Sequence, residues 1–346
     1  MRSYSCQLNH NRKRKMTNQL FQAMVVREEP DNLFIREIRQ RSMAELPEYD
    51  VLIAVRFSSL NYKDALSASG NRGVTRRYPH TPGVDAAGVV MESGSPRCAA
   101  GDEVIVTGYD LGTKIPGGFG QFIRVPAEWI VPLPPGMSLY ESMIYGTAGF
   151  TAAQSVLKIV EHGVKPGDGK ILVSGATGGV GSVSVAILAK LGFQVTAVTG
   201  KPEEHDLLAQ LGASAILSRQ EATDTTGRML LREKWAAVID TVGGDILTTA
   251  IKSTRYGGIV TCCGNVASPQ LNTSVYPFIL RGVTLSGIDS ASCSHEVRVK
   301  VWKKLAVEWK IDQLDQLARI VDLSHLNDEI ESMLQGKTKG RIVVRL

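Results

Sequence analysis

Residues 171–181 read Ile-Leu-Val-Ser-Gly-Ala-Thr-Gly-Gly-Val-Gly, and this stretch decides the fold of the chain. Its first three residues are apolar and partly β-branched, as in a strand buried on both faces of a sheet. Three glycines follow, at Gly175, Gly178 and Gly181. One allows a sharp turn, one admits a pyrophosphate close to the backbone, and one lets the next helix pack against the strand. Because free N–H groups at a helix start favour phosphate, the stretch predicts a dinucleotide-binding turn.

The sequence around this turn has the alternation that a doubly wound sheet requires. Apolar segments that predict further strands occur at residues 194–199, 215–217, 236–240, 258–263 and 283–287. A helical pattern that ends at Gly212 separates the first two. Strands that alternate with helices favour a parallel sheet covered on both faces, so we predict an α/β Rossmann fold for this region.

The sequence before this region predicts a smaller all-β domain. Short apolar strands separated by glycine and proline recur between residues 22 and 125, which is typical of a compact barrel or sandwich. A proline-rich connector at residues 129–138 leads into a helical segment at residues 139–157. Beyond the sheet we predict helices at residues 297–309 and 327–334, and a final strand at residues 340–345 that rejoins the N-terminal barrel.

Composition and charge exclude several classes of protein. With 346 residues the chain is long enough for two domains, and it has no apolar run long enough to span a bilayer, so we expect no membrane partner. Its net charge is +5, but residues 1–15 hold five basic residues and no acidic one, so the remainder is neutral. We therefore expect no nucleic acid partner for the folded body. Residues 1–20 are interpreted as a flexible basic extension, with an address or a nucleic-acid arm as the alternative.

Cysteine usage indicates a reducing environment. The five cysteines show no Cys-x-x-Cys spacing, which argues against a disulfide framework or a structural metal site. The adjacent Cys262 and Cys263 fall in a predicted buried strand, where we interpret them as small apolar core residues. We therefore predict a cytoplasmic protein.

Several separate segments carry a resemblance to a known family. They are Ser59-Leu60-Asn61-Tyr62-Lys63-Asp64, Pro82-Gly83-Val84-Asp85-Ala86-Ala87-Gly88, Gly101-Asp102-Glu103-Val104, Gly146-Thr147-Ala148-Gly149-Phe150-Thr151-Ala152 and Tyr276-Pro277-Phe278-Ile279-Leu280-Arg281-Gly282. In this combination, from about Phe21 to Leu346, the chain resembles the zinc-free branch of the medium-chain dehydrogenase/reductase superfamily, which contains acryloyl-coenzyme A reductases and quinone oxidoreductase-like proteins.

The resemblance implies a division of the chain. A GroES-like β-barrel catalytic domain is expected over residues 21–145 and 290–346, and a Rossmann nucleotide-binding domain over residues 146–289. It also implies a homodimer that pairs through the edge of the nucleotide-binding sheet, between residues 276 and 288.

The residues themselves argue against a metal. A catalytic zinc needs about three protein ligands and a structural zinc about four, usually cysteines. Zinc-bearing relatives have a cysteine near Asn61-Tyr62 and a His-Glu pair at Val84-Asp85, and between Glu92 and Trp129 the only cysteine here is Cys98. His80 is the one histidine nearby, and a single imidazole is not a site. We predict no metal.

The tip of the second sheet strand points to the cofactor. It ends Val198-Thr199-Gly200-Lys201, where NAD enzymes carry an acidic residue that binds the ribose hydroxyls. A glycine and a cation suit a 2′-phosphate instead, so we predict NADPH. Lys201 is the first candidate for the phosphate, Thr199 lines the pocket, and His205 or Arg219 assists. The alternative is that Lys201 is a solvated lysine, with Glu203 and Glu204 opposing a phosphate.

The catalytic end of the predicted site follows from the resemblance. Tyr62 is expected to contact the nicotinamide or its ribose, with Asn61, Lys63 and Asp64 around it. A proton for the substrate would come from Tyr62, Lys63 or a water held by Asp64. The alternatives are that Tyr62 only packs and that Lys63 and Asp64 form a surface pair.

Further candidates lie at strand and helix ends. Thr147 and Thr151 either face the cofactor or serve helix capping and packing, and Phe278 either forms an apolar wall or belongs to the core. Asp240 is interpreted as a support for the following turn. The predicted catalytic residues are Asn61, Tyr62, Lys63 and Asp64, and the predicted cofactor-binding residues are Tyr62, Thr147, Thr151, Gly175, Gly178, Gly179, Val180, Gly181, Thr199, Gly200, Lys201, His205, Arg219, Asn265, Phe278, Ile279 and Ser290.

Together these features predict an NADPH-dependent oxidoreductase with a small-molecule substrate. The first choice is metal-free hydride transfer to an activated carbon–carbon double bond, namely acryloyl-coenzyme A to propionyl-coenzyme A, with quinone reduction as the alternative. A coenzyme A substrate carries phosphates that Arg72, Arg76 and Arg77 would meet, unless these arginines belong to a solvated loop. A non-enzymatic alternative is a cofactor-sensing or RNA-binding relative.

Overall fold

The structure is a computed structural model in which residues 19–346 are described. The expected extension therefore lies almost wholly outside the described residues. The chain divides into two compact units: one ends at Gly146 and also includes Ala318–Leu346, and the other is Thr147–Leu317. Between residues 19 and 346, no helix combines the length and the apolar character needed to cross a membrane.

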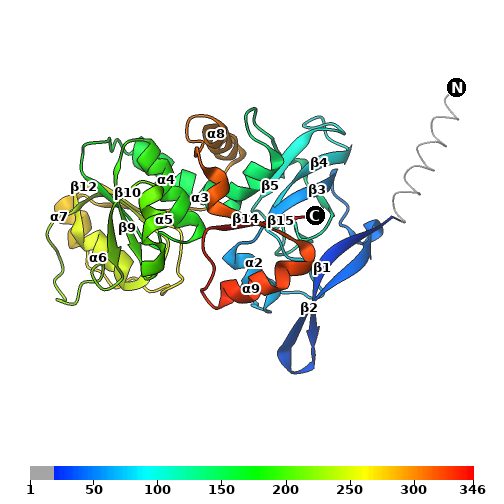
Figure 1. The fold of residues 1–346 in the computed structure, drawn as a ribbon, viewed down its shortest axis with the longest axis horizontal. Coiled ribbons are helices and arrows are strands. Elements are labelled where there is room, and N and C mark those ends of the chain that lie inside the picture. The colour runs from blue at the N-terminus through cyan, green and yellow to red at the C-terminus, as the bar shows by residue number, and fades with distance from the viewer. Residues whose placement is uncertain (1–18) are drawn as a thin grey trace. The chain divides into compact units, whose positions relative to one another are not determined.

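The unit Thr147–Leu317 contains the predicted Rossmann sheet (Figure 1). Its six strands are in the order β10-β9-β8-β11-β12-β13, and every neighbouring pair is parallel. The strands are β8 (Lys170–Val173), β9 (Gln194–Thr199), β10 (Ala213–Ser218), β11 (Trp235–Asp240), β12 (Thr254–Cys262) and β13 (Thr284–Gly287). The helices between and after them are α4 (Gly179–Lys190), α5 (His205–Gln210), α6 (Gly244–Ser253), α7 (Tyr276–Arg281) and α8 (His295–Ala306).

Helix α8 belongs to this unit, whereas residues 290–346 were expected in the catalytic domain. The physical reason is the packing of its buried face. The fully buried ring of Trp302 stacks on Phe150 with 6.0 Å between ring centroids, and the guanidinium of Arg298 lies 5.3 Å from the same ring. The boundary therefore lies after Leu317.

The other unit is built on β-structure, as predicted. Strands β1 (Leu20–Glu29) and β2 (Leu33–Ser42) form an antiparallel hairpin. A seven-stranded sheet has the order β14-β15-β3-β4-β5-β7, with β6 paired to β3. These strands are β3 (Val51–Ser59), β4 (Asp85–Ser93), β5 (Glu103–Thr107), β6 (Phe122–Val125), β7 (Val131–Pro132), β14 (Ala318–Asp322) and β15 (Arg341–Arg345).

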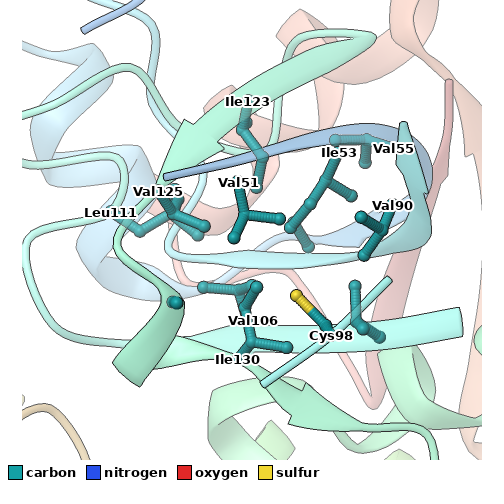
Figure 2. Close-up of a cluster of buried hydrophobic side chains, with 13 residues drawn as sticks. Val51, Ile53, Val55, Val90, Cys98, Val106, Leu111, Ile123, Val125 and Ile130 are labelled. Atoms are coloured by element: carbon teal, nitrogen blue, oxygen red, sulfur yellow. The ribbon is translucent and has the colours of Figure 1, made fainter. Parts of the chain in front are cut away.

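The last strand returns to the N-terminal sheet, which confirms the sequence prediction. Strand β15 pairs antiparallel with β3, with Val343 opposite Ser59. Figure 2 shows one of the buried clusters that hold the sheet together, which includes Val51, Ile53 and Ile123. A second cluster places α9 (Leu326–Leu334) on α2 (Tyr62–Ala68). Short 3₁₀ turns complete the chain: η1 (Pro30–Asn32), η2 (Met43–Glu45), η3 (Ala127–Trp129), η4 (Pro202–Glu204), η5 (Leu314–Leu317) and η6 (Leu323–His325).

Helix α3 (Leu139–Glu161) is interrupted where one unit ends. Gly146 has φ 49° and ψ −157°, so the helical path breaks there and resumes at Thr147. The predicted helix is present, but the sequence pattern did not reveal this break. A positive φ favours glycine at this position.

The four cysteines within residues 19–346 are free thiols. Cys262 and Cys263 are unpaired in disulfides, as the sequence predicts; both are half-buried, and Cys262 packs against the buried cluster of the sheet. Cys262 is the last residue of β12 and Cys263 follows it, so the pair lies at the end of the sheet rather than inside it.

Candidate active site

The glycine-rich turn has the geometry that its sequence predicts. Gly175 has φ +58°, and Gly178 precedes the first residue of α4. A Cβ at Gly181 would lie 2.2 Å from the carbonyl oxygen of Gly175, so only glycine lets α4 come this close to β8. Gly178 is exposed and Gly179 and Val180 are half-buried, which leaves the backbone at the helix start open to a ligand. The turn therefore fits a bound pyrophosphate.

The cationic residues Lys201 and Arg219 lie at the tip of β9, and the strand itself ends without an acidic residue. The hydroxyl oxygen of Thr199 accepts a hydrogen bond of 3.1 Å from the Lys201 backbone N–H. A Cβ at Gly200 would lie 2.6 Å from Nε of Arg219, so the Arg219 guanidinium rests against the Gly200 backbone. Arg219 immediately follows β10 and is exposed. The sequence analysis expects Arg219 only to assist Lys201, whereas the structure brings Arg219 directly against the Gly200 backbone.

The neighbouring charges are distributed around this tip. Glu204 is buried, whereas Glu203 is exposed and brings a negative charge close to the tip in sequence. His205 is the exposed first residue of α5.

The remaining cofactor candidates fall into different environments. Asn265 is exposed after β12, whereas Phe278 packs against the buried core cluster, which favours its core interpretation. Ile279 is 67% exposed. Thr151 donates a hydrogen bond of 2.6 Å from its hydroxyl to the Thr147 carbonyl, which agrees with the helix-packing alternative.

Two further observations concern the ends of the sheet strands. Asp240 accepts a 2.8 Å hydrogen bond from the Gly243 backbone, which confirms its support of the turn. A pocket of about 230 Å³ adjoins the end of β13 and is lined by residues that include Asp289 and Cys293. Burial raises the pKa of the Cys293 thiol, so this group stays protonated. Ser290, the predicted ligand in this loop, is half-buried beside the pocket.

The segment Asn61-Tyr62-Lys63-Asp64 opens helix α2 in the other unit. Tyr62 is 43% exposed and Lys63 is exposed, so Tyr62 does not serve only as packing. Asp64 is fully buried, and its two carboxylate oxygens accept 2.8 Å hydrogen bonds from the backbone N–H groups of Asn61 and Val84. The alternative of a Lys63–Asp64 surface pair is therefore wrong.

Asp64 is part of a buried ionic cluster that the sequence did not reveal. Asp85 is also fully buried, and the buried guanidinium of Arg341 is linked to it through Ser59 and Asn61, each of which bonds to both residues. Burial and the charge of Asp85 raise the pKa of Asp64 to about 7. The only sequence signal was an arginine at the start of an otherwise apolar final strand.

Gly146 closes this cluster from the other side. A Cβ at Gly146 would lie 2.3 Å from Ser59 Oγ, 2.5 Å from Asp85 Oδ2 and 2.7 Å from Arg341 Nη2. The break in α3 and the buried charges therefore occupy one place in the structure. Position 146 requires glycine both for its backbone conformation and for space.

The residues at the positions where a zinc site was considered have other roles in the structure. Asn61 and Val84 are engaged in the hydrogen bonds of the buried cluster, and His80 is buried with its pKa lowered by burial. Over the described range 19–346, no group of three His, Cys, Asp or Glu residues is arranged to hold a metal ion.

The arginines proposed for coenzyme A phosphates are not equivalent. Arg72 forms an ion pair with Glu28, and its guanidinium lies 5.6 Å from the Phe34 ring and 5.3 Å from the Tyr78 ring. Arg72 is therefore committed to local structure. Arg76 and Arg77 are exposed and remain candidates.

Comparison with known proteins agrees with this architecture. Residues 47–135 match the family described as "Alcohol dehydrogenase GroES-like domain", and residues 179–307 match "Zinc-binding dehydrogenase". The acrylyl-CoA reductase AcuI of Ruegeria pomeroyi is 42% identical over 326 residues, which cover 94% of this chain and 99% of that protein. YhfP of Bacillus subtilis, which carries a provisional quinone oxidoreductase name, is 43% identical over 94% of this chain and 99% of its own length.

Solved structures show the same similarity. The yhdH oxidoreductase of Salmonella enterica, in complex with NADP, has a TM-score of 0.91 and 39% identity over 94% of this chain and 99% of that chain. These comparisons confirm the predicted GroES-like unit and Rossmann unit.

The raised pKa of Asp64 predicts a measurable dependence of stability on pH. The ordinary pKa is 3.8 and the folded pKa is about 7, so the folded chain keeps a proton that the unfolded chain releases. The resulting stabilisation is full below about pH 4 and is lost as the pH rises to 7. Between pH 5 and pH 8, we expect the native chain to lose about 2 to 3 kcal/mol more unfolding free energy than Asp64→Asn. Urea unfolding at both pH values measures this difference.

The exposed Asp322, which pairs with Arg345, supplies the control. Asp322→Asn should keep the pH dependence of the native chain. An equal loss of stability in the native chain and in Asp64→Asn would refute the assignment of the titrating group to Asp64.

Proposed function

This chain belongs to the medium-chain dehydrogenase/reductase superfamily, in the branch of the acrylyl-CoA reductases and quinone oxidoreductases, and from that premise we propose that it reduces an enoyl thioester with NADPH. The substrate we propose is acryloyl-coenzyme A and the product propionyl-coenzyme A. The observation that carries the cofactor assignment is the tip of β9, where Arg219 lies against Gly200 and Lys201 follows. The similarity to AcuI supports the substrate class.

The open glycine turn supports a bound dinucleotide. Gly178 is exposed and Gly179 and Val180 are half-buried at the start of α4, and Gly181 removes the side chain that would separate α4 from β8. When bound, NADPH supplies the hydride for the substrate β-carbon. The two cations at the β9 tip then distinguish its 2′-phosphate from the hydroxyl of NADH.

Protein groups must supply the proton and stabilise the developing negative charge. Reduction of a conjugated thioester places a hydride on the β-carbon and a proton on the α-carbon. Tyr62 and Lys63 are the exposed donors of the segment, and we assign the proton to one of them. Asn61 is 8% exposed and Asp64 is fully buried, so we propose that these two position the exposed donors rather than contact the substrate. We propose that the reaction needs no metal, because hydrogen-bond donors can perform the charge stabilisation.

The substrate is tested with a panel of NADPH-dependent reactions. We expect acryloyl-coenzyme A to have the highest kcat/KM, with crotonyl-coenzyme A, simple enones and small quinones lower. Larger kcat/KM for quinones by orders of magnitude would instead support quinone reduction, which the name of YhfP favours. No turnover of any substrate would favour a cofactor sensor.

Cofactor selectivity is tested at the β9 tip. We expect Arg219→Gln and Lys201→Ala each to raise KM for NADPH by about tenfold, because each loses a charge-assisted contact of roughly 1.4 kcal/mol. KM for NADH should not change. Lys190→Ala is the control, because Lys190 is the last residue of α4 and pairs with Asp312, away from this tip. An equal effect on both cofactors would remove Arg219 and Lys201 from the phosphate site.

We also propose a homodimer and a cytoplasmic location. Strand β13 is an edge of its sheet, and the exposed apolar residues Val275, Ile279 and Leu280 lie on or beside the nearby α7. An unpaired edge strand with adjacent apolar surface favours association with a second copy.

The cytoplasmic location is supported by the free thiols of residues 19–346, which agree with a reducing compartment.

The dimer is tested by light scattering after size exclusion. We expect the native chain to have twice the monomer mass of 37.4 kDa and Ile279→Glu to have the monomer mass. Met229→Glu, at another exposed apolar residue of the same unit, should stay dimeric. A monomeric native chain would reject the proposal.

A further inference from the structure

Arg341 connects segments that are far apart in the sequence. It begins β15, is 3% exposed, and follows Asn61 by 280 residues. Its Nε donates to the Ile144 carbonyl at 2.9 Å, and its Nη1 donates to the Leu60 carbonyl at 3.3 Å and to Asn61 Oδ1 at 3.2 Å. Its Nη2 donates to Ser59 Oγ at 2.8 Å. One guanidinium thus bonds to β3, to the entry of α2 and to the first half of α3.

Two of these partners pass the interaction on to Asp85. The Ser59 hydroxyl donates to Asp85 Oδ2 at 2.5 Å, and Asn61 Nδ2 donates to the same oxygen at 2.7 Å. The Asn61 amide therefore has its oxygen on the cation and its nitrogen on the carboxylate. Only this orientation satisfies both charges.

The backbone of Asn61 is fixed as well. Its N–H donates to Asp64 Oδ2 at 2.8 Å, and the Asp64 N–H returns a 2.9 Å bond to the Asn61 carbonyl. Tyr62 follows directly as the first residue of α2, with its side chain exposed. The exposed side chain of Tyr62 therefore follows directly after Asn61, and Asn61 is held by hydrogen bonds to both its side chain and its main chain.

We infer that Arg341 is a positioning residue that fixes Asn61 and thereby sets the orientation in which Tyr62 meets the substrate. The role of Tyr62 rests on the proposed function, whereas the anchoring of Asn61 does not. A lysine cannot replace Arg341, because a single ammonium lacks the planar fork that reaches three segments at once. The anchoring matters because a misplacement of about 1 Å can lower a rate by about 100-fold.

The anchoring is tested first by amide hydrogen exchange, which needs no substrate. We compare the native chain with Arg341→Lys and with Arg345→Lys, a control on the same strand whose exposed side chain pairs with Asp322. Exchange of the Asn61 and Asp64 amides should rise at least about tenfold in Arg341→Lys and stay unchanged in Arg345→Lys. Unchanged exchange in Arg341→Lys would overturn the inference.

Kinetics then separate positioning from general stability. With kcat expressed per NADPH-binding site, Arg341→Lys should lower kcat by about 10- to 100-fold and keep Kd for NADPH within about twofold. A residue with only a structural role would lower the melting temperature and the number of sites while kcat per site stayed native, and this result would overturn the inference. Arg345→Lys should keep the native kcat per site, Kd for NADPH, melting temperature and number of sites.

If Arg341→Lys does not fold, Ser59→Ala removes a single link, and it should raise the same exchange rates and lower kcat per site by at least about threefold; native values in this variant would contradict the inference. If the native chain turns over no substrate in the panel, the proposed function fails, and the exchange comparison alone decides whether Arg341 anchors Asn61.

Discussion

The buried guanidinium of Arg341 shares hydrogen-bond partners with the buried carboxylate of Asp85, and the buried Asp64 bonds to one of these partners. The β-rich unit is organised around this cluster. Burial of an isolated charge is costly, and removal of one partner from a buried pair typically costs about 3 to 5 kcal/mol. Arg341, Asp64 and Asp85 therefore have to be buried together, with Ser59 and Asn61 supplying the hydrogen bonds between them. This requirement brings β15, β3, β4 and the start of α2 to fixed positions. The candidate catalytic segment is a product of that assembly.

Each unit carries its own candidate region, and the two regions differ in how they present groups to a ligand. In the Rossmann unit, the exposed Gly178 has no side chain at the entry of α4, so a ligand can approach the main chain at the helix start. In the β-rich unit, both the backbone and the side chain of Asn61 are held by internal hydrogen bonds, and the side chains of Tyr62 and Lys63 that follow are exposed. The first arrangement suits a phosphate, and the second suits a donor held in one orientation.

The sequence could predict those features that depend on local patterns. The glycine spacing at residues 175–181 and the regular apolar segments identify the parallel sheet, because each strand and turn carries its own signal. Other features depend on partners that are distant in sequence. Asp64 has the sequence context of a surface acid, and its burial follows from Val84 and Asp85 about 20 residues later. Likewise, the amphipathic pattern of α8 predicts a helix but cannot show that Trp302 packs on Phe150.

The position of Arg341 in the chain has a consequence for the order of folding. Its partners Ser59 and Asn61 are made first, then the whole of Thr147–Leu317, and Arg341 only afterwards. During synthesis the Rossmann unit has all of its residues before the β-rich unit has its central cation. Until then Asp64 and Asp85 lack their counter-charge, and closing a loop of this length adds an entropic barrier. Most of the β-rich unit is therefore synthesised well before β15, the strand that completes its buried ionic cluster.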